Sequence, residues 1–271
     1  MKKHDLSDSV TFVVPVNNDD IYKNNFLSSP LFRSGHSHQI LIQRNYSSAA
    51  KAYNDAIDNS LNDLIVFTHQ DVLFPESWLV DLNHALDYLA ENDPLWGVLG
   101  CFGVTPDGHE HGYVYCTGCT RFLGSPAPEP RLIQTLDEIV LIVKKSSGLR
   151  FDDTLPGYHF YGTDICMAAV RDGRRNYAIT AFVLHNTNQV VLFPRDFVLA
   201  YRHVKKHWKS FLPIQTSCTR IEWHNASLYI RYFKRLVRTC LGVLGCTGKP
   251  RIRLKNPLDF LDRLFSKSKV S

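Results

Sequence analysis

The stretch Leu64-Ile65-Val66-Phe67-Thr68-His69-Gln70-Asp71-Val72 joins an apolar run to side chains that can bind a cation. The run is five residues long and apolar at successive positions, which is typical of a strand buried on both faces of a parallel sheet. We therefore expect a strand over 64–68 that ends at His69-Gln70-Asp71. Carboxylate and imidazole groups placed directly after a strand can hold a divalent cation.

On both sides of this stretch, strand patterns alternate with helix patterns. The predicted strands are 10–16, 39–43, 97–102, 138–143 and 178–184, and the predicted helices are 49–56, 77–91, 160–170, 194–209 and 222–245. This alternation predicts an α/β fold in which a doubly wound sheet is flanked by helices. Because ligands bind at the carboxyl ends of such strands, we expect one cleft to hold Asn17, Asn45, Asp71 and His185.

Composition and charge divide the chain. Its 271 residues are 44% apolar and 21% charged, which excludes disordered and fibrous classes. Residues 1–200 hold 15 Lys and Arg against 23 Asp and Glu, a net of −8, whereas residues 201–271 hold 16 against 3, a net of +13. We predict a catalytic and binding domain over 1–215 and a basic helical extension over 216–271. The positive charge of the extension favours an anionic surface as its partner.

Targeting signals are not evident. The N-terminal residues lack an apolar signal core, and no apolar run reaches the roughly 18 residues of a membrane span, so we expect a cytoplasmic protein. Seven cysteines, an odd number, indicate reduced thiols. Nucleic acid is not an expected partner, because the basic charge is confined to the C-terminal segment without an aromatic recognition motif.

Several short motifs occur in a characteristic order. They are Val13-Val14-Pro15-Val16-Asn17, Ala52-Tyr53-Asn54, Ile65 to Val72, Pro75-Glu76-Ser77-Trp78-Leu79, Tyr161-Gly162-Thr163-Asp164-Ile165-Cys166 and Leu184-His185-Asn186. This succession resembles the family-2 glycosyltransferases of GT-A fold, in particular a subgroup with His-Gln-Asp-Val where most members have Asp-x-Asp. The resemblance covers about residues 9–215. It implies a GT-A-like mixed sheet and transfer of a sugar from a nucleotide-sugar donor.

The resemblance also assigns donor-side residues. Asp71 would bind the Mn²⁺ or Mg²⁺ that grips the donor diphosphate, with His69 and His185 as further metal ligands. The loop of Pro15, Val16 and Asn17 matches the cradle of the nucleotide base and ribose. Three side chains complete the expected nucleotide site: Asn45, Asn54 and Gln70. A UDP-sugar is the favoured donor.

Asp164, in Gly-Thr-Asp, matches the family's general base, which deprotonates the acceptor hydroxyl. Asp137 and Glu138 align with the acceptor side, and the acceptor would be a saccharide or a lipid-linked molecule. One base and one metal suffice for a single displacement, so we expect inversion at the anomeric carbon of a hexosyl or N-acetylhexosaminyl group.

The residues alone leave alternatives open. An Asp after a strand is often a turn former, Asp164 has the position of a helix-capping acid, and His185 can simply close a strand. A nucleotidyltransferase or a non-catalytic, degenerate transferase are the competing functions. A nucleotidyltransferase usually has a Gly-rich basic loop after its first strand, and Asn17-Asn18-Asp19-Asp20 has different chemistry.

Two further segments have more than one interpretation. His109, His111, Cys116 and Cys119 have the residue types of a zinc site, although their short spacing also fits a hairpin that turns at Gly118. Residues 226–245 have apolar and basic side chains on opposite faces of a helix. Such a helix lies on an anionic membrane surface or packs in the domain or an oligomer.

Overall fold

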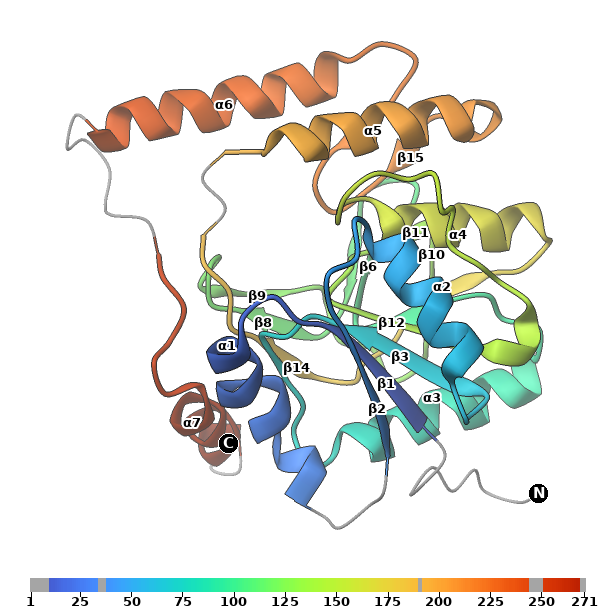
Figure 1. Cartoon of the computed structure of the whole chain (residues 1–271), viewed down its shortest axis with the longest axis vertical. Coiled ribbons are helices and arrows are strands. Elements are labelled where there is room, and N and C mark those ends of the chain that lie inside the picture. The colour runs from blue at the N-terminus through green and yellow to red at the C-terminus, as the bar shows by residue number, and fades with distance from the viewer. Residues whose placement is uncertain (1–9, 34–37, 190–191, 244–250, 269–271) are drawn as a thin grey trace.

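A mixed seven-stranded sheet forms the centre of the molecule. The computed structural model describes residues 10–33, 38–189, 192–243 and 251–268 (Figure 1). The strand order is β10-β13-β5-β12-β3-β1-β2. In that order the strands are β10 (Arg131–Ile133), β13 (Asn176–Ala178), β5 (Leu99–Gly100), β12 (Val140–Lys144), β3 (Leu64–Thr68), β1 (Val10–Pro15) and β2 (Gln39–Gln43). β1 is parallel to β2 and β3, whereas β12 is antiparallel to its neighbours β3 and β5.

Three smaller sheets lie around the central one, in the orders β11-β6-β7, β4-β14-β8-β9 and β15-β16. Their strands are β4 (Val72–Leu73), β6 (Phe102–Val104), β7 (Glu110–Gly112), β8 (Val114–Cys116), β9 (Arg121–Leu123), β11 (Thr135–Leu136), β14 (Val183–His185), β15 (Ile214–Gln215) and β16 (Arg220–Ile221). Three residues separate the end of β3 from β4. The sheet that contains β4 and β14 therefore lies at the carboxyl end of β3, where the metal site is expected.

Helices α2, α4 and α5 cover one face of the central sheet and α3 covers the other; the remaining helices lie around them. The helices of the described residues are α1 (Asp19–Asn24), α2 (Ala49–Asn59), α3 (Trp78–Asn92), α4 (Tyr161–Arg171), α5 (Arg195–His207), α6 (Ala226–Val243) and α7 (Pro257–Ser268), with short 3-10 helices η1 (Phe26–Ser28), η2 (Pro30–Arg33), η3 (Lys145–Ser147) and η4 (Lys209–Phe211). Ile65 and Phe67 of β3 belong to the core beneath α2, α4 and α5, whereas Leu64 and Val66 belong to the core over α3. Alternate side chains of one strand thus bury both faces, as the apolar run predicts.

The expected α/β architecture is confirmed, and two predicted strands are divided. Residues 97–102 form β5 and β6, and residues 178–184 form the end of β13 and the start of β14, in each case in different sheets. Ile179, Ala181 and Phe182 stay buried while the chain crosses between sheets, so hydrophobicity does not mark the break. The predicted helix over 222–245 begins at Ala226, and residues 244–245 lie outside the described residues.

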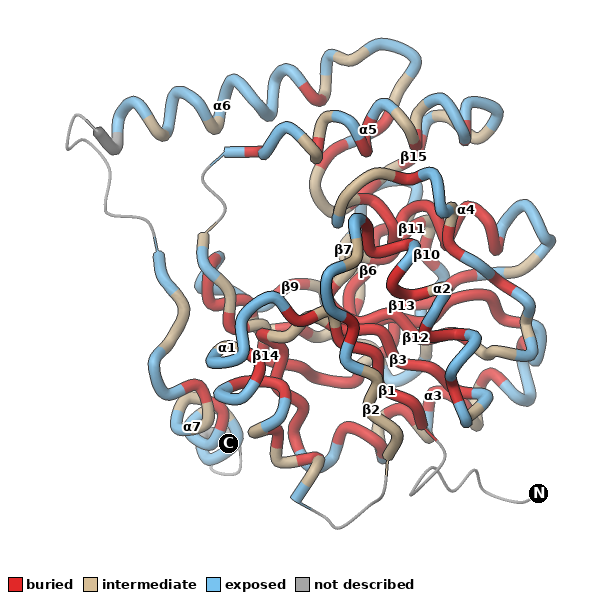
Figure 2. Tube along the Cα trace, viewed as in Figure 1, coloured by how far each residue is buried: buried red, intermediate tan, exposed pale blue. Residues whose placement is uncertain are grey.

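The C-terminal residues return to the body of the protein. Leu261 of α7 is buried against Leu73 and Leu184, whereas α6 lies at the edge with its side chains largely exposed (Figure 2). Hairpin β15–β16 spans the predicted domain boundary at 215, and the division into two domains stays a prediction.

Candidate active site

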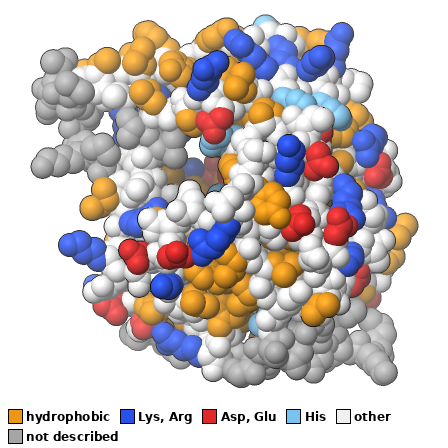
Figure 3. Space-filling model, in the orientation of Figure 1, with side chains coloured by type: hydrophobic (Ala, Val, Ile, Leu, Met, Phe, Trp, Pro, Cys, Tyr) orange, Lys and Arg blue, Asp and Glu red, His pale blue; other side chains and the backbone are white. Residues whose placement is uncertain are grey.

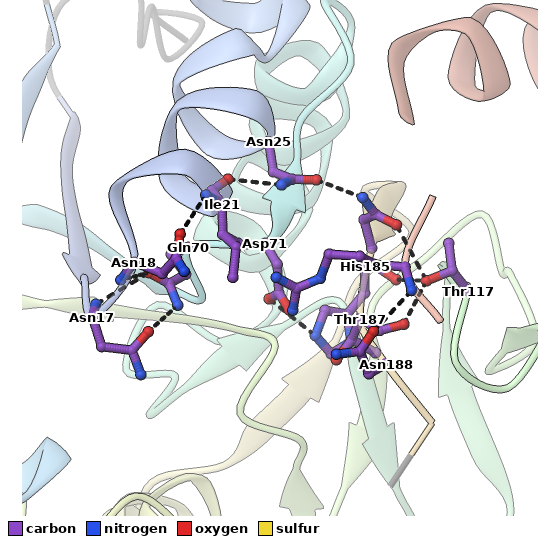
Figure 4. A network of polar contacts seen from close by, with 12 residues as sticks. Asn17, Asn18, Ile21, Asn25, Gln70, Asp71, Thr117, His185, Thr187 and Asn188 are labelled. Carbon is purple, nitrogen blue, oxygen red and sulfur yellow. Dashed lines mark hydrogen bonds and ion pairs between the residues drawn. The ribbon is translucent and has the colours of Figure 1, made fainter. Parts of the chain in front are cut away.

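Three of the predicted metal ligands lie together at the carboxyl end of β3. β4 pairs antiparallel with β14, which sets His185 opposite Val72 and beside Asp71. His185 Nε2 is 3.3 Å from Asp71 Oδ1, and the rings of His69 and His185 are 5.5 Å apart between centroids. One ligand atom from each of His69, Asp71 and His185 lies within 4.8 Å of the other two. Figure 4 shows Asp71 directed toward His185.

Electrostatics keep Asp71 ionised. Burial raises the pKa of Asp71, but the charge and hydrogen bond of His185, with His69 and Arg253, lower it to about 2. Burial lowers the pKa of His185, yet the carboxylates of Asp71 and Asp137 outweigh burial and raise it above its usual value. The pKa of His69 is lowered, first by burial and then by the charge of His185. A buried carboxylate between two imidazoles is therefore ready to act as a ligand.

This donor set fits a divalent cation. His185 Nδ1 is buried without a hydrogen-bond partner in the protein. This nitrogen is therefore available to bind a metal ion. His69 Nε2 is 2.9 Å from the hydroxyl of Tyr161, which donates to the backbone carbonyl of Glu138. Such outer contacts orient a ligating imidazole.

Gln70 connects this cluster to the loop after β1. Its Oε1 accepts hydrogen bonds from the backbone N–H groups of Asn17 and Asn18, both at 3.1 Å, and its Nε2 donates to Asn17 Oδ1 (Figure 4). Pro15 ends β1, and Val16 donates its backbone N–H to the carbonyl of Gln43. The loop predicted to cradle a nucleotide is therefore held next to Asp71.

Asp164 lies in different surroundings from those we expected. Its side chain is buried at the start of α4, where Oδ1 accepts from the Trp208 indole Nε1–H at 2.7 Å and Oδ2 accepts from the backbone N–H of Asp152 at 3.1 Å. Burial raises the pKa of Asp164. Both carboxylate oxygens therefore have hydrogen-bond partners, one from Trp208 directly after α5 and one from the loop at Asp152, and the role of Asp164 as general base stays a prediction.

Asp137 and Glu138 lie closer to the cluster. The negative charge of Asp137 opposes the lowering of the pKa of His69 and adds to the raising of the pKa of His185. Asp137 Oδ2 accepts a hydrogen bond from Ser217 Oγ at 2.6 Å. Burial, with the neighbouring Asp137 charge, raises the pKa of Glu138 to about 8.

Comparison with known proteins gives the family. Residues 11–208 match the model of a family described as "Glycosyltransferase like family". The chain belongs to this glycosyltransferase-like family. A protein from Fuscovulum blasticum named "ATP synthase subunits region ORF 6" is 30% identical over 136 residues, which are 47% of this chain and 52% of that protein. The match thus spans about half the length of this curated relative.

Solved structures of low sequence identity also match. One is the mannosyltransferase PcManGT from Pyrobaculum calidifontis in complex with GDP-Man and Mn²⁺ (14% identity, TM-score 0.45, 75% of this chain and 64% of that chain). Another is TarS 1–349 from S. aureus (15% identity, TM-score 0.45, 73% of this chain and 64% of that chain). A further structure of TarS 1–349 holds UDP (16% identity, TM-score 0.46, 73% and 64%).

Arg253 is a residue of this glycosyltransferase-like protein that sequence reasoning missed. Its guanidinium Nη2 is 3.4 Å from Asp71 Oδ2, although 182 residues separate them. Its backbone N–H donates to Asn188 Oδ1, and Leu254 donates its own to Asn186 Oδ1. Only the basic charge of the C-terminal segment indicated this part of the chain.

Two predicted nucleotide residues lie outside the cluster. Asn45, exposed after β2, has a left-handed φ of 64°. Asn54 donates from Nδ2 to the carbonyl of Phe151 and to Asp153, and its Oδ1 accepts from the Phe151 backbone N–H. Asn54 therefore fastens the loop of residues 151–153, and the structure does not bring it to Asp71.

The four residues that have the types of a zinc site do not converge. Across the described ranges, the groups of three or more His, Cys, Asp or Glu that lie close enough for a metal are His69–Asp71–His185 and Asp152–His203–His207, so His109, His111, Cys116 and Cys119 form no such group. β8 and β9 form a hairpin whose turn contains Gly118, as the alternative predicted.

Proposed function

We propose that this protein transfers a sugar from a nucleotide-diphosphate-sugar donor, preferentially a UDP-sugar, to a hydroxyl of an acceptor, with Mn²⁺ as cofactor. The arrangement of His69, Asp71 and His185 beside the loop held by Gln70 is the observation that carries this proposal. Membership of the glycosyltransferase-like family supports it.

The proposed donor end consists of a metal site, a loop for the nucleotide and one arginine. A bound dication neutralises the charge of the leaving diphosphate. Asp71, His69 and His185 would hold that ion, while Gln70 keeps the Asn17 loop ordered against the nucleotide. Arg253, now paired with Asp71, is positioned to form a charge-assisted hydrogen bond to a phosphate oxygen instead.

We assign the general base to Asp137 instead of Asp164. Asp137 is partly exposed whereas Asp164 is buried, and both oxygens of each carboxylate accept a hydrogen bond. A base must come within hydrogen-bond reach of the hydroxyl that it deprotonates. With one base and one metal, we expect a single displacement that inverts the anomeric configuration.

We place the acceptor at a membrane surface. The exposed residues of α6 include Tyr229, Ile230 and Phe233 next to Arg231 and Lys234, and Figure 3 shows hydrophobic and basic side chains side by side along this edge. A groove of about 390 Å³ between α5 and α6 is lined by aromatic and apolar side chains with Arg195 and Arg202. No described helix combines the length and apolar character needed to span a bilayer. These features suit an anionic lipid surface and a lipid-linked acceptor.

Donor turnover tests the function. Purified full-length protein is incubated with nucleotide sugars and Mn²⁺, and released nucleoside diphosphate is measured. We expect Asp71→Asn to lower the rate at least about 100-fold and Asp137→Asn to lower kcat by about 10²–10⁴-fold. Asp262→Asn, an exposed acid on α7, is the matched control and should retain the rate.

The outcomes separate the competing functions. Metal-dependent binding of nucleotide without any turnover would indicate the non-catalytic protein, and release of pyrophosphate from a nucleoside triphosphate would indicate a nucleotidyltransferase. NMR of the product identifies the anomeric configuration, and a retained configuration refutes the single displacement.

Sedimentation with vesicles tests the membrane surface. We expect vesicles containing anionic lipid to retain the protein at low salt. Changing Arg231, Lys234 and Arg238 to Gln removes about 1 kcal/mol per charge, so partitioning should fall more than about 100-fold. Equal retention by neutral vesicles would contradict the charge-based interpretation.

A further inference from the structure

A second group of side chains that could hold a metal ion lies between α5 and the loop that joins η3 to α4. His203 and His207 are four residues apart, so their rings project from the same face of the helix, and their ring centroids are 5.9 Å apart. Asp152 approaches from the loop between η3 and α4. His203 Nε2 is 2.7 Å, and His207 Nδ1 is 3.2 Å, from the same oxygen, Asp152 Oδ2.

We propose that Asp152, His203 and His207 bind one Zn²⁺ ion, at a site separate from the donor site and independent of sugar transfer. One ligand atom from each residue lies within 4.8 Å of the other two. In a tetrahedral site with metal–ligand bonds of about 2.0–2.2 Å, ligand atoms are roughly 3.3–3.5 Å apart. The observed separations therefore require only small movements.

The rest of Asp152 is arranged as in a ligating carboxylate. Its Oδ1 accepts hydrogen bonds from the backbone N–H and the hydroxyl of Thr154, at 2.9 and 2.6 Å, which leaves Oδ2 directed at the two imidazoles. Outer hydrogen bonds of this kind orient a ligand. The side chains are partly open to solvent, with 15% of Asp152, 24% of His203 and 40% of His207 exposed, so an ion can enter and water can supply the fourth ligand.

Zinc is the cation that this chemistry favours. Two imidazoles and one carboxylate form a common three-residue zinc set, and two His spaced i, i+4 on a helix are a recurrent way to provide it. Mg²⁺ and Ca²⁺ prefer sites made of oxygen ligands.

The position of this group indicates a structural role. The backbone N–H of Asp152 and the indole of Trp208, the residue after His207, are the two hydrogen-bond donors to buried Asp164. An ion shared by Asp152 and His207 would therefore tie together the two segments that hold Asp164. Zinc should raise the thermal unfolding temperature through this link.

Zinc titration with a competing chelator tests the proposal on metal-stripped, full-length protein. We expect His203→Gln and His207→Gln each to remove one bound equivalent, with at least about a 100-fold loss of affinity, more than outer contacts usually give. His224→Gln is the matched control, because His224 contacts one carboxylate, that of Glu222 at 3.6 Å. It should bind zinc as the unchanged protein does.

The same titration on Asp71→Asn separates this site from the donor site. We expect Asp71→Asn to bind one equivalent of zinc and the double variant Asp71→Asn/His207→Gln to bind none. Zinc should not raise the unfolding temperature of the double variant. His69→Gln replaces Asp71→Asn if the latter does not fold, as judged by circular dichroism. Unchanged zinc stoichiometry and affinity in both His203→Gln and His207→Gln would overturn the proposal.

Discussion

Replacing Asp164 by Ala distinguishes a structural acid from a catalytic one. The substitution leaves the Trp208 indole N–H and the Asp152 backbone N–H buried without their acceptor. Each unsatisfied buried donor costs about 1–3 kcal/mol, so we expect a loss of about 2–6 kcal/mol. At about 2 °C per kcal/mol for a chain of this size, Tm should fall by roughly 4–12 °C. Asp164→Asn retains one acceptor oxygen and removes a buried charge, so its loss should be smaller.

Chemical and thermal unfolding followed by circular dichroism measure this effect. Trp208→Phe is the companion variant, because it removes the donor while it keeps an aromatic ring against Phe211 and His207. The two single variants and the double variant form a cycle, and we expect a coupling energy of about 1–3 kcal/mol. Wild-type stability of Asp164→Ala, together with a loss of turnover of 10²-fold or more, would refute this structural assignment and restore Asp164 as the base.

Three further perturbations have defined outcomes. Arg253→Ala should weaken nucleoside diphosphate binding about 10-fold or more in calorimetry, because a charge-assisted hydrogen bond is lost; unchanged affinity would remove Arg253 from the donor site. The Cys116 thiol donates a hydrogen bond to Cys119 and lowers the pKa of Cys119 to about 6. Iodoacetamide should therefore react with Cys119 half-maximally near pH 6, and in Cys116→Ala only at higher pH. A mid-point near pH 9 in the unchanged protein would contradict this. Gly112 has a φ of +117°, and an added Cβ would lie 2.0 Å from the Cys101 carbonyl oxygen. Gly112→Ala should therefore lower the free energy of unfolding, measured by urea titration, by about 3 kcal/mol or more. A loss under about 1 kcal/mol would be inconsistent with this packing.

Local sequence patterns predict β1, β2, β3, β5 and β12 of the central sheet and the meeting of His69, Asp71 and His185, but not β10 or most of β13. The apolar run before His69 places a buried strand, and the rule that sites lie at strand ends selects Asp71 and His185. These two residues are 114 positions apart, yet the rule needs only that each follows or ends a strand. That reasoning succeeds because the burial of a strand is encoded within five or six neighbouring residues, whereas the antiparallel direction of β12 is not.

Long-range partners are what the sequence does not reveal. Nothing near Asp164 shows that Trp208 donates to it from 44 residues away, so a buried structural acid and a catalytic base have the same local pattern. The segment that carries Arg253 to Asp71 is held by hydrogen bonds to the side chains of Asn186 and Asn188. Contacts of this kind leave no periodic pattern in the sequence. The crossing at 179–182 was missed because its residues are as buried as those of a strand.

The register of β14 limits where residues can be inserted into or deleted from the chain. His185 is opposite Val72 on one side and Cys116 on the other, and successive side chains of a strand point to opposite faces. Deleting or inserting one residue in β14 would present Leu184 or Asn186 to Asp71 in place of the imidazole. Natural or engineered length changes should therefore accumulate in the exposed turn at 106–109 and be excluded from β14.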